Sequence, residues 1–374
     1  MRGKSIRTGA AATLAAVFLL FIGVPGAFAL DVGGTAPQTD NGVLNDVINT
    51  AWAEAMRQIG QEVKGINGVP EKFIRSWGDA SIFSSHGATQ RGYGVGKYFT
   101  FTIGPMVGLR LGSGIDGVED YISNIDKKLN KEGDITLGAN VQAITGQLNV
   151  NMSRWLLDGL DLGFKFGMFK LNIENIEFNN WSVGFLGNYQ IIKEKNLAPH
   201  LFKWRGLKLG TGVIYQDTRM GFSMKLDPIT QPLPIPGIGS VGNMKIDPKV
   251  AFNMTTETIT IPLEATTAVH LLSFLNLTLG VGADIGFGKN DMKLGVEGDV
   301  RLEPTTPIFV ETTPGSLTVS AGGAFNPTAF NPKVMTGIGL NIGPVILDVP
   351  VTLYFPGFSD GIGVNAGVTF GLSF

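Results

Sequence analysis

Histidine, serine and cysteine carry most nucleophilic and metal chemistry in proteins, and this sequence offers few histidines and no cysteine. The chain has 374 residues and three histidines. The lack of cysteine excludes disulfides, thiolate nucleophiles and cysteine-bound metals. His86, His200 and His270 form no HExxH motif or other metal-ligand spacing. Ser84, Ser85 and His86 are adjacent, but sequence neighbours rarely have the geometry of a catalytic triad. We therefore expect no catalytic residue, no metal site and no cofactor.

Glycine-rich strings and the charge balance point away from nucleotide and nucleic-acid partners. The sequence has no GxSxG elbow and no Walker lysine. The strings at 92–96 and 280–282 resemble phosphate loops only superficially, and they fit strand alternation or a plug loop better. With 29 Lys+Arg against 31 Asp+Glu, the net charge is −2. This balance gives no electrostatic footprint for nucleic acid.

The composition describes a folded, apolar and glycine-rich chain. Charged residues make up 16%, against about 25% in an ordinary soluble domain. The 52 glycines are roughly twice the usual share. The apolar content of 44% is too high for a disordered chain.

The first 29 residues have the pattern of a secretory signal peptide. A basic start is followed by an apolar run at 9–24 and by small residues at Ala27 and Ala29. We expect cleavage after Ala29 and export of the mature chain. The alternative, an uncleaved anchor helix, is disfavoured because Pro25 interrupts the apolar run before it can span a membrane.

The segment 30–97 precedes the regular part of the chain and is expected to be a plug. Apolar residues recur at three- and four-residue steps over 41–66, which predicts an amphipathic helix. Asp40 or Asn41 can cap its start. Residues 67–97 are rich in glycine and serine and are interpreted as irregular. One amphipathic helix cannot bury its apolar stripe alone, so it must pack against another element.

From Tyr98 the hydrophobic period changes from 3.6 to 2. In 275–288, Leu275, Leu277 and Leu279 begin an apolar series that alternates with small or polar residues. The same pattern recurs in 98–111 and 362–374. Glycine weakens a strand interior, so its frequent use in strands needs a packing reason. A closed barrel in a membrane provides one, because its outer face meets lipid and its inner face is crowded or polar. The sequence therefore predicts an all-β transmembrane antiparallel barrel over 98–374. The competing class, a secreted soluble β-solenoid, should show a fixed short repeat, and the sequence has none.

The strands predict a barrel of about 14 strands, and an even count is typical of bacterial barrels. Such a barrel is wide enough to hold a plug, whereas barrels of about eight strands are filled by side chains. The expected strands are 98–111, 136–151, 159–169, 180–192, 205–216, 219–226, 245–255, 257–268, 274–288, 291–302, 315–323, 332–342, 345–354 and 362–374.

Charged residues on the polar faces of these strands would point into the lumen. Structural pairing is favoured over a substrate site for them. These residues are Arg110, Asp161, Lys165, Lys208 and Asp284.

Two connections are apolar enough to contact a hydrophobic substrate. The segment 114–132 has apolar residues at helical spacing, and 227–243 combines prolines with apolar side chains. If the amino end is periplasmic, 114–132 is external, and the side of 227–243 depends on the strand count. The candidate substrate path consists of Trp77, Phe83, Tyr93, Ile122, Leu233, Ile235 and Ile238.

The layout resembles the FadL-type family of outer-membrane long-chain fatty-acid transporters, which pair an N-terminal hatch with a 14-stranded barrel. The stretches 77–111 and 348–374 are similar to the FadL-like outer-membrane proteins of spirochaetes. The closing strand, which ends at Phe374, also resembles the signature that the barrel assembly machinery recognises. One departure concerns the hatch, since 78–90 lacks the Asn-Pro-Ala motif of the family.

The resemblance implies passive uptake of hydrophobic molecules, such as long-chain fatty acids, across the outer membrane of a diderm bacterium. Its partners would be membrane lipid and the transported molecule. A general porin for polar solutes and a surface adhesin or interaction barrel remain alternatives. An outer-membrane lipase or protease is disfavoured by the poor histidine inventory.

Overall fold

The computed structural model describes residues 29–64, 71–85, 98–111, 137–198, 201–235, 239–304, 310–357 and 361–374. Residues 1–28 of the predicted signal peptide 1–29 lie outside these ranges, and its last residue, Ala29, is the first residue of a strand. The described chain is an antiparallel β-structure with an N-terminal helical segment, so the predicted all-β fold class is confirmed. Neither described helix is long and apolar enough to cross a membrane.

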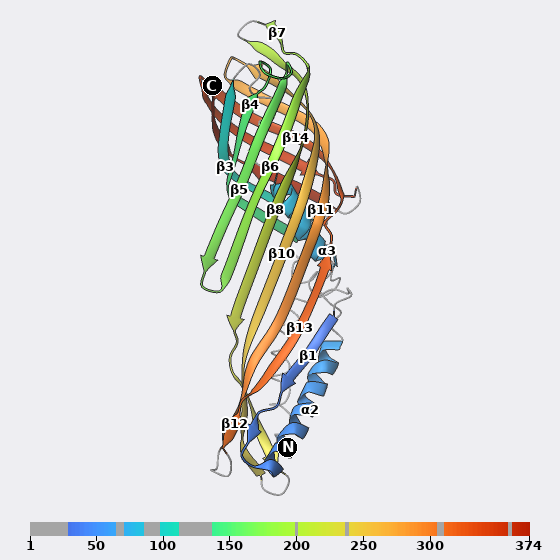
Figure 1. The fold of residues 1–374 in the computed structure, drawn as a ribbon, viewed down its shortest axis with the longest axis vertical. Helices are drawn as coiled ribbons and strands as arrows, with labels where there is room; N and C mark the ends of the chain where they lie inside the picture. The colour runs from blue at the N-terminus through green and yellow to red at the C-terminus, as the bar shows by residue number, and fades with distance from the viewer. Residues whose placement is uncertain are drawn as a thin grey trace.

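The main strands close a ring in which every neighbouring pair is antiparallel (Figure 1). In ring order they are β3 (Phe99–Leu111), β4 (Leu137–Asn151), β5 (Leu160–Ile173), β6 (Ile176–Ile192), β8 (Phe202–Lys225), β10 (Gly239–Leu271), β11 (Leu275–Pro304), β14 (Phe330–Ile342), β15 (Val345–Tyr354) and the pair β16 (Ile362–Gly367) and β17 (Thr369–Ser373). Both β16 and β17 pair with β15 on one side and β3 on the other, so they occupy one position. The ring is therefore a barrel of ten strand positions.

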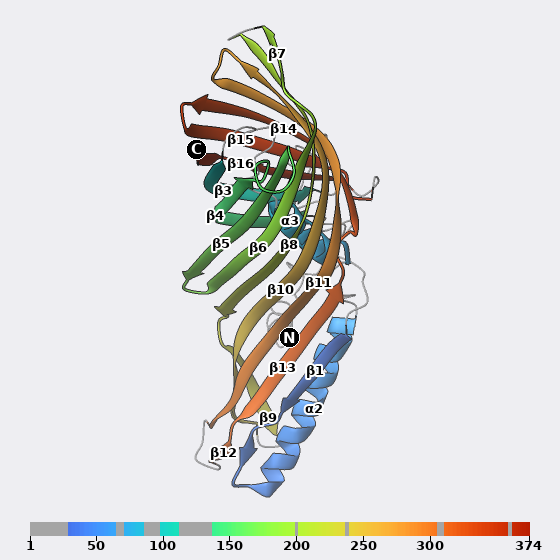
Figure 2. The same ribbon diagram turned by 45° about the horizontal axis from the view of Figure 1, so that its top comes forward.

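The strands β10 and β11 are much longer than the barrel and continue past it. Beyond the barrel, β10 pairs with β9 (Ile229–Ile235) and β11 pairs with β13 (Gly315–Phe325). Strand β1 (Ala29–Thr35) pairs with the other edge of β13. Helix α2 (Gly42–Lys64) packs beside β1, and a small sheet of β2 (Gln38–Thr39) and β12 (Glu311–Thr313) closes the tip. We call this part the extension; it forms the lower half of Figure 1 and curves to one side in Figure 2.

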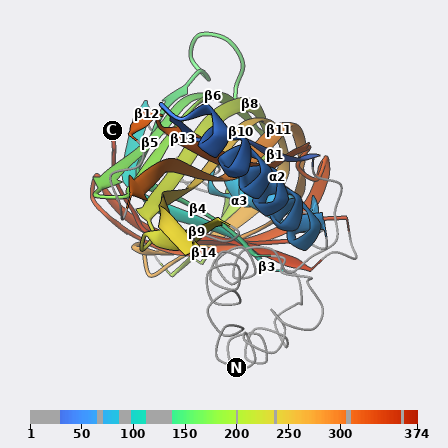
Figure 3. The same ribbon diagram turned by 90° about the horizontal axis from the view of Figure 1, so that it is seen from below.

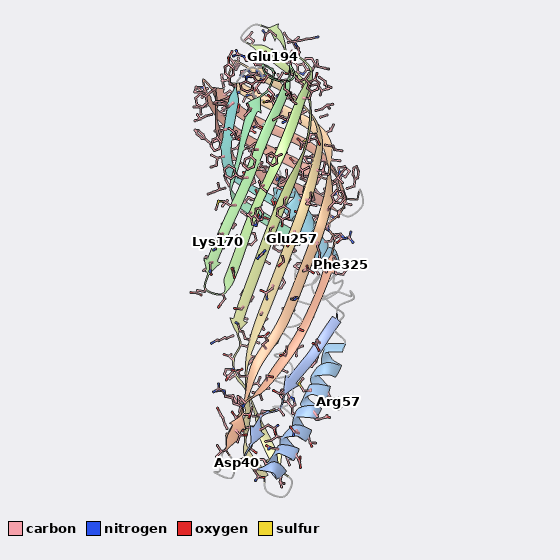
Figure 4. The ribbon with its side chains drawn as sticks, viewed as in Figure 1. Asp40, Arg57, Lys170, Glu194, Glu257 and Phe325 are labelled. Atoms are coloured by element: carbon pink, nitrogen blue, oxygen red, sulfur yellow. The ribbon has the colours of Figure 1, made fainter. Side chains whose placement is uncertain are left out.

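The opposite end of the barrel holds the last residue and the shorter connections. We call it the C-terminal rim. The main chain of Phe374 exchanges hydrogen bonds with that of Phe99 (2.8 and 3.2 Å). The short strand β7 (Lys195–Ala198) extends β8 there, and Glu194 marks this end in Figure 4 while Asp40 marks the tip of the extension. The connections described in full at this rim include 152–159, 272–274 and 343–344.

The ten-position ring differs from the expected count of about 14 because three pairs of predicted strands are continuous. The predicted strands 205–216 and 219–226 form β8, and the same merging produces β10 and β11. The predicted breaks at 217–218, 256 and 289–290 fall at or beside polar residues such as Asp217, Glu257 and Lys289, which resemble turn signals. The predicted strand 315–323 is real, but as β13 it belongs to the extension.

The N-terminal segment contains more regular structure than the sequence indicated. The predicted helix 41–66 is confirmed as α2, and Asn41 Oδ1 accepts hydrogen bonds from the amides of Val43 (3.1 Å) and Leu44 (3.3 Å). The prediction that 67–97 is irregular is wrong for α3 (Glu71–Ser84). Small residues such as Ser76 and Gly78 interrupt the apolar period of this helix and hid it.

The polarity of β11 inverts halfway along its length. On the outward face, the apolar series from Leu275 to Phe287 gives way to a charged series from Lys289 to Glu303. On the inward face the change is opposite. Buried polar residues occupy the barrel half, and buried Met292, Leu294 and Val296 begin the extension half.

Neighbouring strands invert in the same register. On the outer face, Tyr215, Ile259 and Phe287 pair in one apolar row. The next outward-facing row towards the extension consists of Asp217, Glu257 and Lys289. Inside, the polar row Thr218, Thr256 and Asn290 is followed by Met220, Met254 and Met292. We call the step between these rows the inversion line. It separates a barrel that is apolar outside from an extension that is apolar inside.

The apolar outer band of the barrel has the height of a bilayer core. The run Leu275–Phe287 on β11 covers about 41 Å along the strand at about 3.4 Å per residue. With a tilt of about 45°, this corresponds to about 29 Å, close to the hydrocarbon thickness of a membrane. Large exposed apolar side chains lie on this band, among them Leu279, Val281 and Phe287.

Candidate functional site

Helix α3 lies inside the ring at the mouth that faces the extension. It packs against β3, β4, β8, β10, β11 and β16 of the wall, and Figure 3 shows it within the circle of strands, behind α2. Every described side chain from Asp79 to Ser85 is buried. The helix therefore fills space inside the ring at this mouth of the barrel.

Wall glycines make room for the helix. A Cβ atom at Gly108 would lie 2.4 Å from the carbonyl oxygen of Ala80, and one at Gly138 would lie 2.0 Å from that of Ser76. A Cβ at Gly363 would meet the ring of Phe83 at 2.2 Å. Because two of these three contacts are with backbone, a side chain at those positions would displace the helix. Part of the high glycine content thus serves close packing inside the lumen.

One charged contact fixes α3 to two different strands. The carboxylate of Asp79 lies 3.5 Å from Nε of Arg110 on β3, and both side chains are at least 98% buried. The same carboxylate accepts hydrogen bonds from the amide (2.7 Å) and hydroxyl (2.9 Å) of Thr328, in the connection between β13 and β14. Asp79 therefore joins the plug helix, the barrel wall and the base of the extension.

A network of amides and hydroxyls holds another side of the helix. Nε2 of Gln216 on β8 lies within hydrogen-bond distance of Oγ of Ser81 (2.8 Å) and Oγ of Ser84 (3.2 Å). Gln142 on β4 donates to Gln216 Oε1 at 2.9 Å and to Ser182 Oγ at 3.1 Å. Because these groups are buried, their mutual hydrogen bonds offset the cost of removing them from water. Ser84 thus has a structural contact, the hydroxyl of Ser85 donates to the carbonyl of Ile82 at 2.6 Å, and His86 lies outside the described residues.

The end of α3 that carries Phe83 packs against the strands of the C-terminal hairpin. The ring of Phe83 stacks on Tyr354 with a centroid distance of 4.0 Å. The side-chain amide of Asn365 donates to the carbonyl of Phe83. Phe83, a predicted path residue, is fully buried in this contact.

The other end of α3 belongs to the apolar core of the extension. Buried Ile74 is part of that core, and Phe73 and Trp77 pack against it with their rings 6.3 Å apart. On the sheet side the core contains Met254, Met292 and further apolar residues of β10, β11 and β13. On the helix side it is covered by Leu44, Ile48 and Trp52 of α2. One continuous apolar interior therefore runs from α2 to the plug helix.

The predicted lumen charges are largely buried and most take part in ion pairs. Lys208 Nζ lies 3.2 Å from Asp161, and Lys165 is fully buried. Asp284 lies 2.5 Å from Nζ of Lys333.

Sequence reasoning missed Lys333 and its second partner, Glu264, also at 2.5 Å. It also missed Asp79. The first two stand at inward positions of predicted strands, so the period-2 pattern could have found them. Asp79 lies in a helix that was not predicted, so the sequence carried no signal for it.

The structure places only part of the predicted substrate path. Trp77 and Phe83 lie on the same helix, one at the extension core and one inside the barrel. Leu233 and Ile235 fall in β9, where they pair with Gly242 and Gly239 of β10. Tyr93, Ile122 and Ile238 lie outside the described residues. Within the described ranges, no group of three His, Cys, Asp or Glu residues is arranged to hold a metal ion.

Comparisons with known proteins identify a family. Similar solved structures include the CymD monoaromatic hydrocarbon channel (9% identity, TM-score 0.25, covering 79% of this chain and 97% of that chain). The translocator domain of autotransporter NalP from Neisseria meningitidis is also similar (9%, TM-score 0.29, 87% and 98%). A third is a FadL homologue of Pseudomonas aeruginosa (12%, TM-score 0.21, 80% and 97%). At these TM-scores the similarities carry no argument about function.

No curated protein matches the chain. A family model described as Lsa36-like matches residues 29–371, which include every described strand of the barrel except the last residues of β17. The chain therefore belongs to the Lsa36-like family.

Proposed function

We propose that this protein is an outer-membrane channel for hydrophobic molecules, closed in the described state by α3. The membrane location is supported by the apolar outer band of the barrel. Exposed side chains such as Leu279, Val281 and Ile338 would be costly in water and are favourable in lipid. Long-chain fatty acids are the substrate class that we propose for the channel.

The observation that carries the proposal is the continuous apolar interior between α2 and the plug helix. Its central row consists of Met220, Met254 and Met292. Methionine side chains are flexible and polarizable, so they adapt to apolar guests of irregular shape. Trp77 and Phe73 end this interior directly on α3. A hydrophobic molecule that enters the extension would thus reach the element that closes the barrel.

In the proposed mechanism, transport is passive. The molecule displaces packing between α2 and the sheet, meets Trp77, and loosens α3 from the wall. Gly108 and Gly138 present small surfaces to the helix, so on β3 and β4 it can slide without displacing a wall side chain at these two positions. The contacts of Asp79 with Arg110 and of Gln216 with Ser81 must break when it moves. Release follows towards the periplasm or sideways into the membrane. The residues of this chain bind the hydrophobic molecule and exclude water from it, and no step requires a cofactor.

The test combines conductance and binding on the refolded chain without residues 1–29. Planar bilayers should show little conductance, and a fluorescent fatty acid should bind saturably. Met254→Gln keeps the side-chain length but buries an amide, which should weaken binding about tenfold (~1.4 kcal/mol). The control is Met224→Gln on β8, where the side chain is 38% exposed. Large ohmic conductance without binding would instead indicate an open porin.

A second candidate is a surface interaction protein that does not transport. The observation that favours it is the charged outward face of the extension, where Lys245, Asp247 and Lys249 follow one another on β10. The same experiments separate the two, because an interaction barrel would show neither saturable fatty-acid binding nor an effect of Met254→Gln.

A further inference from the structure

The residues beside the inversion line have the chemistry of a membrane interface. Trp181 on β6 and Tyr215 on β8 lie on the outer face with ring centroids 5.1 Å apart, and Phe287 occupies the Tyr215 row two strands on. Aromatic residues of barrels gather at the level where hydrocarbon meets headgroups. Trp181 is in register with Asp217, one outward-facing row beyond Tyr215, so these rings lie on both sides of the inversion line.

Cations begin in the row of Trp181, which contains Lys289, and continue in the next outward-facing row, which contains Lys170 and Arg219. Lys170 is exposed near the end of β5, and Arg219 and Lys289 are 64% and 62% exposed on β8 and β11. Asp217 contacts the guanidinium of Arg219 at 3.1 and 3.2 Å, and Asp291 lies 2.8 Å from Nζ of Lys289. In Figure 4, Lys170 and Glu257 are at the same height along the long axis of the molecule. Exposed cations at this level can reach lipid phosphates from the water side.

Beyond this level the outward face of the molecule is charged, as in a water-soluble protein. The outward face of the extension carries Lys293, Glu297 and Arg301 on β11, while its interior is the apolar core under α2. A lipid-facing Lys or Arg in a barrel costs about 2–4 kcal/mol at the bilayer midplane. The extension therefore stands outside the membrane.

The connections indicate on which side it stands. Bacterial barrels have short periplasmic turns and longer extracellular loops. The C-terminal rim carries the short turns 272–274 and 343–344 and the longer connection 152–159. The extension end carries the short turn 174–175, but the strand ends Leu111 and Leu137, which 25 residues separate in sequence, also lie there. The extension end is thus the side of the long loops.

From these observations we infer that the inversion line lies in the headgroup layer of the outer leaflet, where phosphate-bearing lipids contact Lys170, Arg219 and Lys289, and that the extension projects into water outside the cell. The inference rests on the proposed outer-membrane location and not on the transported molecule. It also sets the direction of uptake, because a molecule from outside meets the apolar core of the extension before it meets α3.

The absence of native cysteine makes the test direct. Single-cysteine variants of the full chain are exposed on intact cells to a polyethylene-glycol maleimide too large to pass porins. Lys293→Cys and Glu297→Cys on the extension should label in intact cells. Leu272→Cys, exposed at the C-terminal rim, should label only after the outer membrane is permeabilised. Leu279→Cys in the apolar band should label only after denaturation.

Each outcome discriminates between the ideas. Labelling of Leu272→Cys but not Lys293→Cys in intact cells would place the extension in the periplasm and overturn the inference, while the channel proposal would survive. Equal labelling of Leu279→Cys and Lys293→Cys would overturn the membrane location itself. For the level of the line, spin labels at Lys289→Cys and Val281→Cys in liposomes should favour a water-soluble nickel chelate and oxygen, respectively. If the nickel chelate, or oxygen, were favoured at both positions, the proposed level of the inversion line would be overturned.

Discussion

At the residue scale, two features place α3 against the wall: glycines, whose lack of a side chain lets the helix approach, and Asp79, which joins α3 to Arg110 and Thr328. They act in different ways. The glycines permit contact without contributing to it, whereas Asp79 supplies attraction that depends on its charge. Substitutions of the two kinds should therefore open the mouth with different accompanying losses of stability.

Gly138→Leu should open the barrel to ions. The new Cβ would lie 2.0 Å from the Ser76 carbonyl oxygen and cannot be relieved by rotation of a side chain, so α3 must shift. Planar-bilayer conductance should rise well above that of the parent protein. Gly187→Ala on β6 is the matched control, since its Cβ would meet only Leu162 at 3.7 Å. Unchanged conductance of Gly138→Leu would mean that α3 does not seal the mouth.

Asp79→Asn should both destabilise the fold and raise conductance. The substitution keeps the side-chain volume but removes the negative charge that lies 3.5 Å from the buried Arg110 guanidinium, and removal of one member of a buried ion pair typically costs about 3–5 kcal/mol. The midpoint of urea unfolding in micelles and bilayer conductance measure the two effects. Adding Arg110→Gln should recover part of the stability, because the buried positive charge is then removed as well.

The control for Asp79→Asn is Arg57→Ala on α2. Its partner Glu54 lies 2.7 Å away, but both side chains are about half exposed, and such surface pairs contribute about 0–1 kcal/mol. Equal unfolding midpoints for Asp79→Asn and Arg57→Ala would contradict the importance that we give to the buried contact.

At the element scale, the strands and α2 were predictable, and α3 and the ring were not. Strict alternation in β11 and the stripe containing Leu44, Ile48 and Trp52 are local signals that survive folding. The sequence predicted a break at 256, beside Glu257, because polar and charged residues there resemble a turn, although they mark a change of surroundings within the continuous strand β10. Helix α3 is held by contacts with the wall, such as that between Gln216 and Ser81, which no local pattern contains.

The dependence of α2 on its apolar stripe gives a prediction for this element. Ile48→Ala removes a side chain that is 1% exposed between the helix and the sheet, and should cost about 2–5 kcal/mol of local stability. Limited proteolysis should then cut within 42–64 much faster than in the parent protein. Val43→Ala, at a position 78% exposed, should leave the cleavage rate unchanged. Equal rates for the two variants would mean that α2 is not held by the sheet.

At the scale of the whole molecule, the same strands have an outer face suited to lipid in the barrel and an outer face suited to water in the extension. Continuous strands carry an apolar outer face in the barrel and an apolar inner face in the extension, and the exchange occurs in one register row on β8, β10 and β11. A side chain must therefore be judged by its position along the strand as well as by its face. This dependence on position can be measured at two residues on the same face of β11, Val281 and Gly295.

Val281→Arg and Gly295→Arg place the same charge on the same outward face of β11, fourteen residues apart in sequence. Val281 is 58% exposed within the apolar band, so arginine there should reduce membrane insertion by about 2–4 kcal/mol if it lies near the midplane. Gly295 lies between Lys293 and Glu297 in the extension, and a Cβ there has no neighbour closer than 3.7 Å. The folded fraction in liposomes, read from heat-modifiable electrophoretic mobility, should fall for Val281→Arg and stay unchanged for Gly295→Arg. An equal loss for both variants would show that the outer faces of barrel and extension share one environment, and the inversion line would then have no meaning as a membrane boundary.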